Sequence, residues 1–370
     1  AQVAPLEQVP GQLELCTAVM ETVEERHQRE LAEIQKRHKR EVKEVQDRHV
    51  REMKEIKDRH VRETGPVKRR RLPTPASEHL RNPCLYVMGG KSGSIMFSSV
   101  ERFDPRDEEW GGVDSMGCKR SKFAAAVLGH YLYVLGGNDF RSSPTASVER
   151  FDTKSGEWSK APPMGTERAD LAAVSAGGFL YAIGGLDESS EELSCVERFD
   201  PRAGNWTEVA PLLSPRCGHC AITLAEEAIF VLGGYDGSCV VATAERFDLK
   251  KGTWSETIPM MSPRKDFAAA VLNSEIYVLG GHDDEACQLD TVERFDGRSW
   301  AHVRCMSTSR SAFSAAVVNG ELYAIGGMDD MYEKLASVER FVPRAGAWVP
   351  AKPLDTARSD HTAAVLGDAC

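Results

Sequence analysis

Apolar and polar residues follow two different patterns along the chain. Over residues 12–64 the apolar positions recur at helical spacing, whereas from residue 83 onward they form short runs separated by turn residues. Short apolar runs between Gly, Pro, Asp and Ser are typical of β-strands. The chain is therefore expected to be mainly β over residues 83–370. A tail at 1–11, a long α-helix at 12–64 and a linker at 65–82 are expected before it.

The strand-like part repeats one unit six times. The run LYVMGG at 85–90 returns in five near-identical copies, and successive second glycines lie 46 to 49 residues apart. A VERFD-like run and then a tryptophan follow each diglycine, and an arginine stands ten residues after each tryptophan. The diglycines are Gly89, Gly90, Gly136, Gly137, Gly184, Gly185, Gly233, Gly234, Gly280, Gly281, Gly326 and Gly327. The tryptophans are Trp110, Trp158, Trp206, Trp254, Trp300 and Trp348, and the arginines are Arg120, Arg168, Arg216, Arg264, Arg310 and Arg358.

Each unit contains four β-rich runs, which predicts one four-stranded sheet per repeat. Sheets of this kind, repeated at about this period, pack radially into a propeller and bury both of their faces. We expect the diglycines to end strands and the tryptophans to fill the space between blades. The first unit lacks its first strand and the chain ends with an unpaired HTAAVL run, so the C-terminal strand is expected to close the ring.

The diglycine, the VERFD run, the tryptophan and the following arginine resemble kelch repeats over residues 83–370. The resemblance implies a six-bladed β-propeller that binds a partner protein or peptide and is not an enzyme. It is nearest to the kelch-like substrate adaptors of cullin-RING ubiquitin ligases, although no BTB or F-box domain is visible in the sequence. A cytoskeletal or actin-associated scaffold role remains an alternative.

The segment before the propeller carries an eleven-residue repeat from residue 26. Its apolar positions and His27, His38, His49 and His60 fall on one helical stripe. A coiled coil that makes the protein a homo-oligomer is the favoured interpretation, and a solitary helix held by i,i+4 ion pairs is the alternative. The basic run Lys68–Arg71 indicates either a nuclear-import signal or a solvated linker.

Composition and charge narrow the function classes further. The formal charge is −10, split into about +2 on residues 1–80 and −12 on the rest, so an acidic body argues against nucleic-acid binding. No apolar run is long enough to cross a membrane, and scattered cysteines are typical of reduced thiols, which favours a cytoplasmic location. No residue spacing indicates a cofactor or a metal site.

Two motifs could carry chemistry. Cys217-Gly218-His219-Cys220 has the letters of a disulfide-isomerase site, but it leads into a strand rather than a helix, and we interpret it as coincidence. The resemblance also admits a copper radical oxidase with His219 and His361 as ligands. Equivalent positions in the other repeats hold Phe123, Leu171, Phe267 and Phe313, without the tyrosines that this chemistry needs.

Repeated carboxylates are expected to be structural. An aspartate two residues after a diglycine can cap its own turn. The glutamates of the VERFD runs lie on a buried strand face, where they require a cationic partner, and the repeat arginines can supply it. The aspartates are Asp139, Asp187, Asp236, Asp283 and Asp329, and the glutamates are Glu101, Glu149, Glu197, Glu245, Glu293 and Glu339.

Positions that vary between repeats are the candidates for partner binding. By the kelch-like resemblance, the residue two after each repeat arginine faces the bowl in which partner peptides dock. These residues are Lys122, Asp170, Gly218, Asp266, Ala312 and Asp360. The loops after the diglycines add the acidic candidates Asp187, Glu188, Asp283, Asp284, Asp329 and Asp330. A predominantly acidic face predicts a basic or mixed-charge partner.

Overall fold

The computed structural model describes residues 83–224 and 227–367. The predicted tail at 1–11, helix and coiled coil at 12–64 and linker at 65–82 lie outside these residues. Within the described residues, no helix has the length and apolar character needed to span a bilayer.

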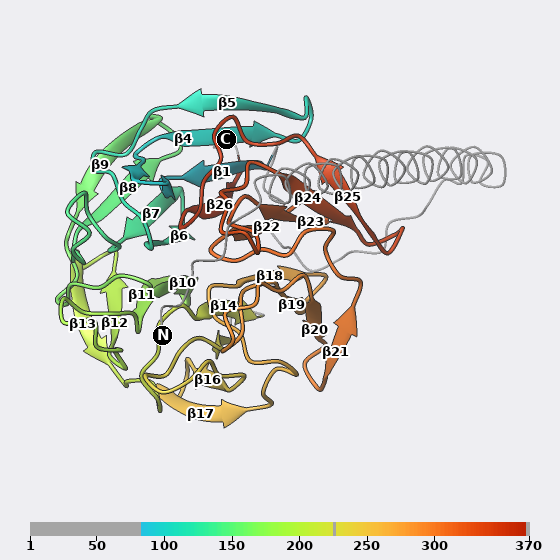
Figure 1. The fold of residues 1–370 in the computed structure, drawn as a ribbon. Helices are drawn as coiled ribbons and strands as arrows, with labels where there is room; N and C mark the ends of the chain where they lie inside the picture. The colour runs from blue at the N-terminus through green and yellow to red at the C-terminus, as the bar shows by residue number, and fades with distance from the viewer. Residues whose placement is uncertain (1–82, 225–226, 368–370) are drawn as a thin grey trace, which may run out of the picture. The chain divides into compact units, whose positions relative to one another are not determined.

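Six four-stranded antiparallel sheets form the blades of a propeller, which confirms the predicted six-bladed β-propeller (Figure 1). The strands of each blade are given from the axis outward. Blade 1 consists of β26 (Thr362–Leu366), β1 (Cys84–Met88), β4 (Val100–Asp104) and β5 (Glu109–Val113), and blade 2 of β6 (Ala124–Leu128), β7 (Tyr131–Leu135), β8 (Val148–Asp152) and β9 (Glu157–Ala161). Blade 3 consists of β10 (Ala172–Ala176), β11 (Phe179–Ile183), β12 (Val196–Asp200) and β13 (Asn205–Val209), and blade 4 of β14 (Cys220–Leu224), β15 (Ala228–Leu232), β16 (Ala244–Asp248) and β17 (Thr253–Thr257). Blade 5 consists of β18 (Ala268–Leu272), β19 (Glu275–Leu279), β20 (Val292–Phe295) and β21 (Trp300–Val303), and blade 6 of β22 (Ser314–Val318), β23 (Glu321–Ile325), β24 (Val338–Val342) and β25 (Ala347–Ala351). A small hairpin of β2 (Lys91–Ser92) and β3 (Ile95–Met96) lies in a loop of blade 1.

The core lies between the blades. Each of the six blade interfaces holds one cluster of buried apolar side chains, so the second strand of each blade is buried on both faces. In β7, for example, Leu132 faces blade 1 and Tyr133 faces blade 3. A strand that is buried on both sides needs a continuous apolar run, which is why these strands lack polar alternation.

The tryptophans pack between blades, as predicted. Trp206 on β13 lies opposite Phe199 on β12, with the ring centroids 5.2 Å apart, and both belong to the cluster between blades 2 and 3. The indole Nε1–H of Trp206 donates to the carbonyl of Pro162, 2.9 Å away, in the segment that joins these blades. The same bond is repeated by the other five tryptophans.

The C-terminal strand closes the ring, which confirms the expectation from the sequence. β26 pairs with β1 from Cys84 opposite Leu366 to Met88 opposite Thr362. Blade 1 thus contains both ends of the described propeller, and its innermost strand is supplied from the C-terminal side. This closure pairs an edge of β1 that would otherwise be open.

The diglycines end the second strands where the chain turns close to other backbone. Gly280 has φ +57°, and a Cβ there would stand 2.5 Å from the carbonyl oxygen of Arg310. Gly281 has φ +87°, and its Cβ would stand 2.6 Å from the carbonyl oxygen of Lys265. Only glycine fits both the conformation and the space.

Candidate functional site

The six repeat arginines and the six VERFD glutamates form buried ion pairs, as predicted. Arg264 Nη2 lies 2.7 Å from Glu293 Oε1, and both side chains are fully buried. Arg264 Nη1 also donates to the carbonyl of Gly280 at 2.8 Å. The equivalent pairs are Arg120–Glu149, Arg168–Glu197, Arg216–Glu245, Arg310–Glu339 and Arg358–Glu101.

Each buried glutamate also holds the segment that enters its blade. The second carboxylate oxygen of Glu293 accepts the backbone N–H of Met261 at 2.7 Å, and Glu149 accepts that of Gly117 at 2.6 Å. Because every charge in the unit has a partner, the ion pair is tolerated in the interior and fixes the chain before each innermost strand. These residues are scaffold.

Two residues after each arginine, the chain forms a closed ring around the propeller axis. We call Lys122, Asp170, Gly218, Asp266, Ala312 and Asp360 the axial ring. The N–H of each member donates to the carbonyl of the member in the preceding blade, over 2.7–3.1 Å, so six hydrogen bonds run once around the axis. All six residues have positive φ, between 49° and 59°. The six positions predicted to face the bowl are therefore brought together by the backbone.

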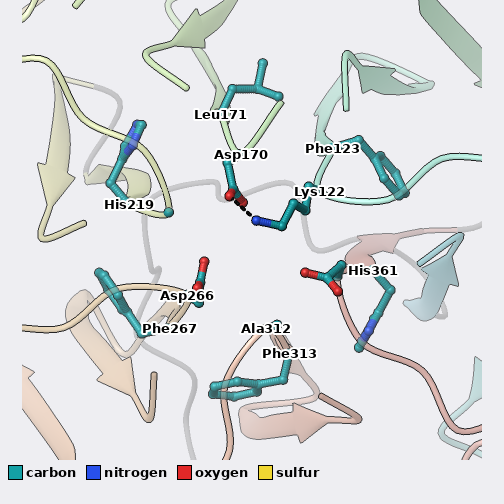
Figure 2. Close-up of a pocket in the computed structure, with 12 residues that line it drawn as sticks. Lys122, Phe123, Asp170, Leu171, His219, Asp266, Phe267, Ala312, Phe313 and His361 are labelled. Atoms are coloured by element: carbon teal, nitrogen blue, oxygen red, sulfur yellow. Dashed lines mark hydrogen bonds and ion pairs between the residues drawn. The ribbon is translucent and has the colours of Figure 1, made fainter. Parts of the chain in front are cut away.

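The side chains of Lys122, Asp170 and Asp266 point toward the centre of the axial ring (Figure 2), and together with Asp360 they border a cavity of about 100 Å³. Lys122 Nζ lies 2.5 Å from Asp170 Oδ2. The other two aspartates have partners outside the ring: Asp266 Oδ2 lies 3.1 Å from His282 Nε2, and Asp360 Oδ2 lies 3.4 Å from Lys91 Nζ. Each carboxylate of the axial ring therefore has a basic neighbour.

Burial and neighbouring charges shift the pKa values in this cluster. Burial raises the pKa of Asp170 to about 6, although Lys122 opposes the shift, and Asp170 in turn raises the pKa of Lys122. Burial also acts to raise the pKa of Asp266, but the hydrogen bond with His282 and the charge of Lys122 outweigh it and lower that pKa. The same hydrogen bond raises the pKa of His282.

In the possible redox motif Cys217 is buried and Cys220 is partly buried, and both thiols stay protonated. Burial raises the pKa of Cys217 and of Cys220 to about 12, and nearby carboxylates add to the shift. Cys220 Sγ donates to the carbonyl of Phe267 at 3.1 Å. A redox nucleophile needs a lowered thiol pKa, so this geometry does not provide one.

His219 and His361 occupy packing positions on opposite sides of the opening (Figure 2). His219 packs under Gly184 just as Phe267 packs under Gly233. Burial, and then the charge of the neighbouring arginine, lowers the pKa of each histidine to about 3. No tyrosine lines this cavity, and the described residues contain no cluster of three or more His, Cys, Asp or Glu side chains that could hold a metal ion.

The loops that follow the diglycines, here called the diglycine loops, lie on the same face as the axial ring. They pair through isolated bridges with the segments that connect successive blades, as Asn138 does with Ser121. This loop face carries both sets of predicted binding residues. The opposite face carries the turns between first and second strands and between third and fourth strands.

The structure divides the predicted acidic loop residues into three groups. Asp187, Asp283 and Asp329 each accept two N–H groups of their own loop, so they cap turns as expected for aspartates at this position. Glu188 and Asp330 are exposed at loop tips, and Asp330 accepts the hydroxyl of Ser309. Asp284 accepts the N–H of Val240 at 2.8 Å and links the loops of blades 4 and 5.

Sequence reasoning missed several residues of the loop face. Lys91 and His282, each the first residue of a diglycine loop, are the partners of axial aspartates. Ile95 and Phe140 stand exposed at loop tips, with 61% and 71% of their surfaces accessible. Apolar residues among the polar loop positions were the available signal for the latter two.

Six radial sheets with this buried Arg–Glu unit define a kelch-type propeller. The sequence matches the model described as "KLHDC2/KLHL20/DRC7 Kelch-repeats domain" over residues 122–327 and 172–370, and the model "Kelch motif" over residues 81–117. The chain therefore belongs to the kelch-repeat family, whose propellers are typical protein-interaction modules.

Curated relatives match over short segments. An F-box/kelch-repeat protein of Arabidopsis thaliana is 47% identical over 55 residues, which are 15% of this chain and 12% of the relative. Kelch-like protein 13 of Bos taurus and of Homo sapiens are each 42% identical over 60 residues, or 15% of this chain and 9% of the relative. The chain thus matches about a tenth of the length of these relatives.

Proposed function

We propose that this protein is a non-enzymatic interaction module that binds a segment of a partner protein on its loop face. One observation carries the proposal: the Arg–Glu unit is the same in all six blades, whereas the axial ring and the diglycine loops differ from blade to blade. Variation confined to one face of an otherwise repeated scaffold is typical of a recognition surface. The acidic loops of this face favour a partner with basic or mixed charge.

A role as the substrate-recognition part of a cullin-RING ubiquitin ligase is the second candidate. It is supported by the matches to an F-box/kelch-repeat protein and to Kelch-like protein 13. A homo-oligomer formed by residues 12–64 is supported by their eleven-residue apolar repeat, and it would raise avidity for a repetitive partner. The corresponding expectation is that light scattering gives the full chain a mass of at least twice 40.7 kDa.

Charge reversal on the two faces tests the proposal. Glu188, Glu285 and Glu333 are exposed on the loop face, and Lys250 and Lys251 are exposed on the turn between β16 and β17 on the opposite face. Proteins retained by the immobilised full chain are identified by mass spectrometry. The triple variant E188K/E285K/E333K should lose at least one specifically retained protein by tenfold or more, whereas K250E/K251E should retain it. Equal retention by both variants contradicts the proposal.

A further inference from the structure

The loop face has a cleft between blades 1 and 2 whose mixed lining includes three apolar side chains. Ile95, on β3 of blade 1, and Phe140, in the diglycine loop of blade 2, both line it, together with Met96 and Lys119. The cleft has a volume of about 460 Å³. Two large apolar side chains exposed on neighbouring loops indicate a contact surface rather than ordinary solvated loop tips.

Both apolar side chains are held by local structure. Blade 1 has Ser92 where the other repeats have the capping aspartate, and its loop instead forms the β2–β3 hairpin that carries Ile95. In blade 2, Asp139 Oδ1 accepts the N–H groups of Arg141 and Ser143, over 2.8 and 3.2 Å, and fixes the turn that carries Phe140. A surface that is ordered before binding loses less entropy when a partner docks.

The charges around this cleft are basic. Lys119 and Arg141 are exposed and form no ion pair with any residue of 83–224 or 227–367, and the Arg141 guanidinium lies 5.1 Å from the centre of the Phe140 ring. Lys91 also lines the cleft, and its ammonium group forms an ion pair with Asp360. Asp139 is the nearby carboxylate, and one of its oxygens is already held by the turn amides.

The diglycine loops of blades 3 and 5 have the opposite charge. Residues 186–194 and 282–290 each contain four carboxylates and neither Lys nor Arg. The loop face therefore changes from basic and apolar at blades 1 and 2 to acidic at blades 3 and 5. A uniformly basic partner would be repelled at the first of these regions.

We propose that the cleft between blades 1 and 2 binds an acidic segment of a partner protein, with a large apolar residue placed between Ile95 and Phe140 and carboxylates paired with Lys119 and Arg141. This inference rests on the proposed function and sets the orientation in which a mixed-charge partner binds the loop face. The acidic and apolar part of the partner lies on blades 1 and 2, and its basic part faces blades 3 and 5.

Selection from a random 12-residue peptide library displayed on phage, with the full chain immobilised, tests the inference. Selected peptides are then labelled, and their Kd values are measured by fluorescence anisotropy. We expect peptides with a Leu, Phe or Trp and at least two Asp or Glu within three positions of it. K119E and F140S should each weaken their binding at least tenfold.

Two matched controls separate a local effect from a general one. M331S removes a comparably exposed apolar loop tip from blade 6, and K250E reverses an exposed charge on the opposite face. Both should leave the Kd of these peptides within twofold. Circular dichroism melts of all variants verify that the exposed substitutions leave the fold intact.

Different failures identify different errors. Basic peptides that lose affinity in E188K and E285K but bind normally to K119E and F140S overturn the cleft assignment and leave the proposed function standing. If no peptide is selected, or if every selected peptide is insensitive to substitutions on the loop face, both the inference and the proposed function fail.

Discussion

The buried arginines and the axial ring are both sixfold, and they stand only two residues apart in each repeat. The first set is identical in every blade, whereas the second contains three aspartates, a lysine, a glycine and an alanine. Arg264 has a fully buried side chain with a carboxylate and carbonyl partners. Asp266, two residues later, turns its side chain to the opening and uses its backbone to close the ring.

The difference lies in which part of the residue the fold requires. At the arginine position the scaffold needs a guanidinium, since an unpaired buried glutamate is costly. At the axial position it needs a backbone N–H, a carbonyl and a positive φ. Gly adopts positive φ without strain, and Asp tolerates it better than most residues do. The side chain at the axial position is therefore available for other chemistry.

The largest expected effect is the loss of one buried arginine. In Arg264→Met, the fully buried carboxyl group of Glu293 would lose its cationic partner, so we expect about 3–5 kcal/mol of lost stability. Urea denaturation monitored by tryptophan fluorescence measures this loss. The double variant R264M/E293L, which removes both charges, should recover a large part of it.

A loss below about 1 kcal/mol in R264M would contradict the scaffold role of this unit. Failure of the double variant to recover stability would show instead that the bonds of Arg264 to backbone carbonyls matter more than its ion pair. Arg168 and Glu197 provide an equivalent buried pair for repetition in another blade.

The second largest expected effect is a loss of stability in acid caused by His219 and His361, which occupy positions that hold phenylalanine in three other blades. Their pKa is lowered to about 3 in the folded protein, against about 6.5 in an unfolded chain. Below pH 6.5 the unfolded state binds protons that the folded state does not. The stability that the two neutral histidines allow at pH 7 is therefore lost progressively as the pH falls from 6.5 toward 3. At pH 5 the linkage relation gives a loss of about 2 kcal/mol for each histidine.

H219F and H361F should each remove part of this acid sensitivity, because phenylalanine fills the same place in blades 2, 5 and 6. The measurement is the change in unfolding free energy between pH 7.5 and pH 5.0. His302 is exposed on β21, and H302F is the control that should leave the change unaltered. An unchanged pH dependence in H219F/H361F would show that other groups cause the acid sensitivity.

The sequence was sufficient to predict the propeller because the repeat gives the same information six times. The diglycines, the tryptophans and the buried Arg–Glu pairs all recur at fixed spacing, and each has a physical role that requires its residue type. The closing strand could also be inferred, because HTAAVL has the pattern of the five other innermost strands.

The site was less accessible to sequence reasoning, because it depends on neighbours that are distant along the chain. The partners of Asp360 and Asp266 are Lys91 and His282, which come from different loops and carry no repeated signal. The cleft between Ile95 and Phe140 likewise requires two loops that differ from the repeat. Residues that break a repeat cannot be placed by comparison with the other copies.

The smallest expected effect is at the axial ring itself. Lys122 is 31% exposed and Asp170 15%, so their ion pair faces the opening rather than the core. In Lys122→Met we expect a change in stability of about 1 kcal/mol or less at pH 7.5. The pKa of Asp170 should rise further above about 6, because the nearest positive charge is gone. Carbon-13 NMR titration of the aspartate carboxyls measures that shift, and urea denaturation measures the stability.

The double variant K122M/D170N sharpens the contrast with the buried arginines. If the axial ring is held by its backbone, removing both charges should leave the fold as stable as either single variant, to within about 1 kcal/mol. A loss of 3–5 kcal/mol, like that expected for R264M, would place Lys122 in the scaffold. The axial position would then be restricted by its side chain, and its variation between blades would no longer point to recognition.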